Sequence, residues 1–138
     1  MKAHSVLRTS SKVLIPPIML FGLYVQFHGD FGPGGGFQAG VLFAVAFILY
    51  SLVIGFDKAR RVAPPGVMLS LSAVGLMIYV GTGFVTMFLG ANFLDYDVLA
   101  SNHISAQHYG IIAVEVGVGV AVATVMIGVF FAFAGRGR

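Results

Sequence analysis

One carboxylate lies inside a long apolar stretch of this sequence. Glu115 is the only Asp, Glu, Lys or Arg residue between positions 98 and 135. A carboxylate within the hydrocarbon of a membrane is costly unless it is protonated, paired or hydrated, and such residues are usually functional. We therefore interpret Glu115 as an ion or proton site on a buried path; a hydrogen-bonded structural acid is the alternative. No basic residue lies in the other apolar stretches, so we expect its partner to be another chain or water.

Polar residues precede Glu115 on the same stretch. His108 lies seven residues earlier, which places it on the same face of a helix, two turns toward one end. Gln107 and His103 lie close to it in sequence. Together they predict a polar funnel that leads from the outer surface to Glu115. The alternative is that His103 and His108 simply occupy the headgroup zone.

Metal and cofactor chemistry has little support in the sequence. There is no cysteine, which excludes disulfides, thiolate metal sites and a cysteine nucleophile. Asp95, Asp97 and His103 are of ligating types, but their spacing matches no known metal site. A haem anchor needs histidines at matched depths within helices, whereas the histidines here lie near the ends of the apolar stretches or in the N-terminal tail: His4, His28, His103 and His108. We expect no cofactor and no nucleic-acid partner.

Two threonines lie one helical turn apart in the third apolar stretch. Thr82 and Thr86 are expected to bond the carbonyls of their own helix, as such residues usually do in apolar surroundings. A role in lining an ion path is the alternative.

The elements that carry these residues follow from composition. Hydrophobic residues make up 58% of the 138 positions and charged residues only 9%, against roughly 25% charged in soluble domains. Of four long uncharged stretches, the last three easily reach the length of about 20 residues that a membrane-spanning helix needs. The first, residues 13–29, is short but can borrow a turn from its flanks. The sequence predicts an all-α membrane protein, a single four-helix domain over residues 1–138, with helices at 12–28, 37–56, 65–90 and 104–134.

Local signals set the expected helix boundaries. Prolines are harmless in the first turn of a helix, where the backbone N–H that proline lacks would have no partner. Pro16 and Pro17 fit the first turn of the first predicted helix, and Pro64 and Pro65 fit the start of the third. Candidate N-caps of the fourth helix are Ser101, Asn102 and Ser105. No small-residue cleavage site follows the first stretch, so we expect it to be retained rather than removed as a signal peptide.

The distribution of basic residues predicts the orientation. All eight fall on one face of an alternating four-helix arrangement: Lys2, Arg8, Lys12, Lys58, Arg60, Arg61, Arg136 and Arg138. The loops on the opposite face contain no Lys or Arg, and their charged residues are all acidic: Asp30, Asp95 and Asp97. Because basic loops stay on the cytoplasmic side, we expect both termini to be cytoplasmic and the protein to be a multi-pass component of a cell membrane.

A glycine-rich segment joins the first two predicted helices. It has no Gly-Lys-Ser/Thr and follows no strand, which excludes a phosphate-binding loop. Its glycines permit irregular backbone at the membrane edge. Gly36 and Gly40 form a small-xxx-small pair that allows another helix to approach closely, and Gly117 and Gly119 repeat the theme in the fourth helix. The motif residues of interest are Pro33, Gly34, Gly35, Gly36, Phe37, Gln38 and Gly40.

The sequence HGDFGPGGGFQAG at 28–40, followed directly by a membrane helix, resembles the B-type subunits of the Mrp (Mnh) multisubunit cation–proton antiporters. The resemblance continues through all four helices and includes the run Glu115-Val116-Gly117-Val118. It differs at Ala39, where glycine is common in that family. The resemblance implies a small, non-enzymatic subunit of a bacterial or archaeal complex that exchanges Na⁺ for H⁺, with large subunits similar to those of respiratory complex I as partners.

Other functions stay open at this point. Related subunits occur in membrane-bound hydrogenase-type complexes, where redox chemistry drives ion movement. A small drug–proton transporter also has four helices and one membrane carboxylate, but its acid lies in the first helix, which here has none. A purely structural role inside a larger complex is the remaining alternative to an ion path through Glu115.

Overall fold

The computed structural model describes residues 2–29 and 31–136, with side chains from residue 5 onward. It contains six helical elements and, within those ranges, no strand: α1 (Lys2–His28), α2 (Gly36–Ile54), α3 (Phe56–Val62), α4 (Pro65–Phe88), the 3₁₀ helix η1 (Tyr96–Leu99) and α5 (His103–Ala134). Four of them are long and apolar enough to cross a membrane. The expected all-α protein with four membrane-spanning helices is therefore confirmed. The predicted positions of Asp30 and Arg138, and of the Lys2 and His4 side chains, lie outside the described residues.

Two of the expected helix starts are found. Pro64 caps α4 and Pro65 is its first residue, where the missing N–H costs nothing. Asn102 caps α5, and its side-chain oxygen accepts a hydrogen bond from the Ile104 N–H at 3.1 Å. Of the three candidate N-caps, Asn102 is thus the one that performs this role.

The expected start of the first helix is wrong. α1 begins at Lys2, so Pro16 and Pro17 lie inside the helix and not in its first turn. No glycine or proline occurs between residues 2 and 11 to stop the helix. Membrane helices tolerate internal proline because neighbouring groups satisfy the carbonyls that it leaves unbonded.

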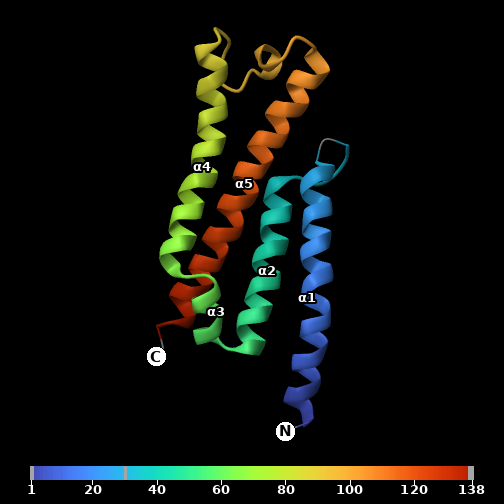
Figure 1. The fold of residues 1–138 in the computed structure, drawn as a ribbon, viewed down its shortest axis with the longest axis vertical. Coiled ribbons are helices and arrows are strands. Elements are labelled where there is room, and N and C mark those ends of the chain that lie inside the picture. The colour runs from blue at the N-terminus through green and yellow to red at the C-terminus, as the bar shows by residue number, and fades with distance from the viewer. Residues whose placement is uncertain (1, 30, 137–138) are drawn as a thin grey trace.

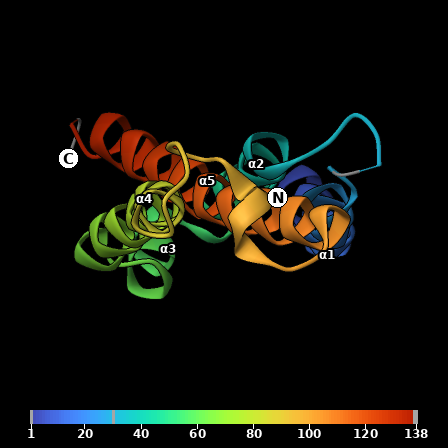
Figure 2. The ribbon, with the colours of Figure 1, turned by 90° about the horizontal axis from the view of Figure 1, so that it is seen from above.

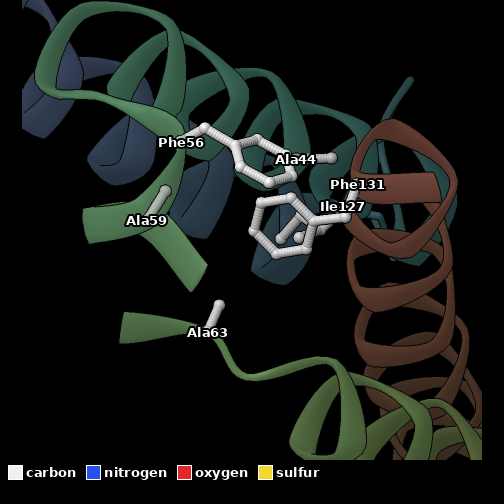
Figure 3. Close-up of a cluster of buried hydrophobic side chains, with 6 residues drawn as sticks. All are labelled: Ala44, Phe56, Ala59, Ala63, Ile127 and Phe131. Carbon is white, nitrogen blue, oxygen red and sulfur yellow. The ribbon is translucent and has the colours of Figure 1, made fainter. Parts of the chain in front are cut away.

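The basic connection between the second and third spans is also a helix and not a loop. Gly55, with φ 113°, ends α2 and begins the short helix α3. Phe56, Ala59 and Ala63 are buried and pack in a cluster with Ala44 of α2 and two α5 residues, Ile127 and Phe131 (Figure 3). Because the apolar residues of α3 recur at helical spacing, one face of α3 is covered and its basic residues face outward.

α5 is the central element of the bundle. It runs obliquely across the molecule, with α4 on one side and α2 on the other, and α1 packs mainly against α2 (Figures 1 and 2). Small residues bring these helices together: a Cβ added to Gly40 would lie 2.7 Å from the Gly119 carbonyl oxygen, and one added to Gly75 would lie 2.6 Å from that of Gly117. Close backbone approach of this kind is how membrane helices associate.

The two ends of the bundle differ in charge. The start of α1 and the end of α5 lie at the same end as α3 (Figure 1). Arg60 and Arg61 belong to α3, and Arg136 follows shortly after α5. We call this the basic end. The opposite end, which we call the loop end, contains η1 with its Asp97. The described residues between α1 and α2, Gly29 and 31–35, lie on this side of the bundle (Figure 1), and we call them the glycine loop.

Candidate functional site

Glu115 lies on α5 where the glycine loop passes over this helix. A Cβ added to Gly29 would lie 2.7 Å from both Cδ and Oε2 of Glu115, and one added to Gly35 would lie 2.8 Å from its Oε1. The backbone of Gly36, the first residue of α2, is in contact with the Glu115 carbonyl oxygen. The carboxylate is therefore packed directly on bare backbone at both ends of the loop.

The local sequence explains how the loop reaches this position. After α1 ends, the Phe31 N–H donates to the His28 carbonyl at 3.0 Å, and the Gly35 N–H donates to the Val25 carbonyl at 3.1 Å. These bonds fold the loop back over the last turn of α1. Gly35 adopts φ 113° and ψ −179°, a conformation essentially reserved for glycine. The loop thus returns toward α5 only because glycine occupies this position.

This arrangement changes the surroundings expected for Glu115. Its side chain is half-buried and faces polar backbone where an isolated helix would expose it to lipid. Polar neighbours lower the cost of a carboxylate at this depth. Sequence reasoning looked for a partner in another chain or in water, and it missed this contact within the chain.

His108 lies at the loop end, beside a cavity of about 390 Å³. Gln107 and His108 line it from α5, and Phe31 lines it from the glycine loop. His108 is exposed and lies roughly 10 Å from Glu115 along the helix axis, given a rise of 1.5 Å per residue. The loop that packs on Glu115 therefore also forms a wall of the cavity beside His108.

His103 and Gln107 are drawn together by an acid of η1. The His103 Nδ1 lies 2.7 Å from the Asp97 Oδ1, and the Gln107 Nε2 donates to the same oxygen at 2.6 Å. His103 is 70% exposed and Asp97 50% exposed, so the pair is largely screened by water. Two of the polar residues expected to line a funnel, His103 and Gln107, thus attach η1 to the first two turns of α5.

Tyr96 anchors the other side of η1. A Cβ added to Gly110 of α5 would lie 2.8 Å from the Tyr96 Cβ, so the tyrosine packs directly on the glycine backbone. Burial, followed by the nearby Tyr79, raises the pKa of Tyr96 above its ordinary value of 10.0. Tyr96 therefore stays neutral and packed at any pH below that value.

Thr82 and Thr86 bond backbone carbonyls of their own helix. Thr82 donates to the Ile78 carbonyl at 2.8 Å, and Thr86 to the Gly83 carbonyl at 2.8 Å. The Thr86 oxygen also lies 3.0 Å from the Asn92 carbonyl and accepts the Leu94 N–H at 3.0 Å. Thr86 is fully buried. Thr86 therefore stabilises the turn after α4. None of these hydrogen bonds brings Thr82 or Thr86 next to Glu115.

One polar residue of this region was missed from the sequence. The Gln26 side chain extends from α1 to contact Gly119, where an added Cβ would lie 3.5 Å from the Gln26 Cδ. Gly119 is one turn beyond Glu115 on α5. Gln26 also lines a groove of about 600 Å³ that is otherwise mainly apolar. A carboxamide inside an apolar span was the signal that could have found it.

The other motif residues of the glycine-rich segment lie around this contact. Gly34 is close to α1, where an added Cβ would lie 3.0 Å from the Val25 carbonyl oxygen. Three side chains point away from the protein interior and are exposed: Pro33, Phe37 and Gln38. Their exposed positions at the membrane edge leave them accessible to neighbouring molecules.

Comparison with known proteins agrees with this architecture. Residues 6–128 match the family model MnhB, described as a domain related to the MnhB subunit of the Na⁺/H⁺ antiporter. The chain is 31% identical over 137 residues to proteins named "Putative antiporter subunit mnhB2" from Staphylococcus aureus (strain Newman) and Staphylococcus haemolyticus (strain JCSC1435). The match covers 94% of this chain and 94% of each relative. The chain therefore belongs to the family of MnhB-related antiporter subunits, multi-pass proteins of the cell membrane.

Proposed function

We propose that this chain is a non-catalytic membrane subunit of a Na⁺/H⁺ antiporter complex, and that it contributes both to assembly and to an ion path through Glu115. Family membership supports the transport role. The expected orientation, with the basic end in the cytoplasm, directs the glycine loop and His108 toward the outer side of the membrane. The chain forms one membrane domain, and its partners are other subunits, including large ones similar to those of complex I.

The contact between Glu115 and the glycine loop carries the proposal. A carboxylate that binds and releases a proton or Na⁺ needs polar surroundings that tolerate both charge states. The backbone at Gly29 and Gly35 provides such surroundings within the span. Phe31 of the same loop lines the cavity beside His108, and we infer that this cavity gives ions or water an approach from the loop end.

The test is Glu115→Gln in the assembled complex. We expect the variant to assemble normally and to lose most Na⁺/H⁺ exchange in membrane vesicles, because glutamine keeps the shape of the side chain and removes its titration. Glu115→Asp should retain part of the activity. The matched control is Asp57→Asn at the basic end, an exposed acid, which should leave exchange unchanged.

Two results would count against an ion path through Glu115. Exchange at the wild-type rate in Glu115→Gln would limit the chain to a structural role. Loss of the assembled complex in that variant would make Glu115 an assembly residue, because the loss of exchange would then follow from the missing complex. Co-purification in mild detergent identifies the setting: large complex-I-like subunits alone fit an antiporter, whereas a hydrogenase module fits a redox-driven pump.

A further inference from the structure

A second groove lies at the basic end, between α3, α4 and α5, away from Glu115. Its volume is about 450 Å³. Arg60 of α3 lies at this groove together with apolar side chains of α4 and α5, among them Met68, Leu69, Val125 and Phe131. The groove therefore combines one guanidinium group with a hydrocarbon wall.

Aromatic contacts hold the guanidinium in place. The Arg60 Cζ lies 5.6 Å from the centre of the Phe56 ring, at the distance of a cation–π interaction. The Phe56 ring in turn packs edge-on against Phe131, with 5.5 Å between ring centres. Phe131 also lines the groove, so the guanidinium lies beside the buried cluster that packs α3 against α5; Figure 3 shows Phe56 and Phe131 of this cluster.

The wall beside Arg60 offers mainly hydrocarbon. Its two hydroxyl groups are engaged within their own helices: Ser72 donates to the Leu69 carbonyl at 2.8 Å, and Thr124 to the Val120 carbonyl at 2.7 Å. Gly128 forms an open part of the wall, since a Cβ added there would meet nothing within 4 Å. No carboxylate is among the described residues that line the groove.

We propose that this groove binds one anionic phospholipid, with the phosphate on Arg60 and an acyl chain along α4 and α5. Arginine binds phosphate through two parallel N–H donors, and basic pockets between membrane helices bind anionic headgroups. One guanidinium group beside a mainly hydrocarbon wall matches a ligand with one phosphate and an acyl chain. The lipid site is independent of any ion path through Glu115.

Native mass spectrometry of the purified full-length chain tests the site, with palmitoyl-oleoyl phosphatidylglycerol and the corresponding phosphatidylcholine as probes. The wild type should retain one phosphatidylglycerol in preference to phosphatidylcholine. Arg60→Gln should weaken phosphatidylglycerol binding about fivefold, the effect of one basic residue at an anionic membrane surface. Arg61→Gln is the matched control, because Arg61 is exposed on the same helix but does not line the groove.

A second pair of variants tests the acyl-chain wall. Gly128→Leu should exclude the bound lipid, whereas Gly81→Leu, at an equally open position of α4 outside the groove, should not. Equal losses in Arg60→Gln and Arg61→Gln would overturn the proposal by showing a general charge effect. Lipid retention in Gly128→Leu, with loss of another subunit from the assembled complex, would overturn it by identifying the groove as a protein interface.

Discussion

Gly35 and Gly55 form a natural pair for testing whether the glycine loop positions Glu115. Both adopt φ 113°, so alanine at either site is strained by about 1–3 kcal/mol. Their surroundings differ. A Cβ at Gly35 would lie 2.8 Å from the Glu115 Oε1, whereas one at Gly55 would meet nothing within 4 Å. The two alanine variants therefore share the backbone cost, and only Gly35→Ala disturbs the acid.

We expect both variants to lower the stability of the purified chain by a similar amount, roughly a tenfold to hundredfold change in the folding equilibrium. Stability is measured by unfolding in mixed detergent micelles. Na⁺/H⁺ exchange is measured in vesicles and normalised to assembled complex. Per complex, Gly35→Ala should lose most exchange and Gly55→Ala should keep it.

The reasoning fails if the two variants lose exchange equally, because the loss would then follow from stability alone. It also fails if Gly35→Ala assembles normally and exchanges at the wild-type rate. In that case the acid does not depend on the loop.

Two further predictions concern the loop end. Thr86→Val should destabilise the turn after α4 by about 1–3 kcal/mol, because the part-buried Leu94 N–H loses its acceptor. Faster amide exchange at residues 92–94 would show this, while Thr82→Val, which removes only a bond within α4, should leave those amides protected. The pKa of Tyr96 is raised in the folded protein, so its contribution to stability is complete below its unfolded pKa near 10 and is lost as the pH rises through the folded pKa. Tyr96→Phe should remove this loss of stability at alkaline pH. Tyrosinate absorbance in a pH titration would report the ionisation of Tyr96.

Much of the fold could be predicted from the sequence because each span carries its own signal. The apolar stretches predicted four spans, and proline and asparagine predicted the starts of α4 and α5. Errors arose where one signal had two readings. A proline usually lies in the first turn of a helix, so Pro16 and Pro17 suggested a helix start. Nothing in the residues before them stops a helix, and α1 therefore begins at Lys2. The basic residues of α3 suggested a loop and concealed its buried face.

The candidate site was harder to predict because it depends on a contact between distant segments. Glu115 was evident as a charge in an apolar stretch, and the glycine loop as an unusual motif. Nothing in either segment indicated that Gly29 and Gly35 pack on that carboxylate. The contact between Gln26 and Gly119 was equally hard to predict from the sequence, because it depends on how closely α1 approaches α5.

The unequal lengths of the helices link this subunit to the thickness of its bilayer. α2 has 19 residues and α5 has 32, or about 28 Å and 48 Å at 1.5 Å per residue. Only the first matches a hydrocarbon layer of about 30 Å. α5 runs obliquely across the bundle (Figure 1), and we expect it to accommodate its excess by this tilt and by extending its first turns, with His103 and His108, toward the headgroups. A thinner membrane would favour a greater tilt of α5 and would shift Glu115 relative to the loop that holds it.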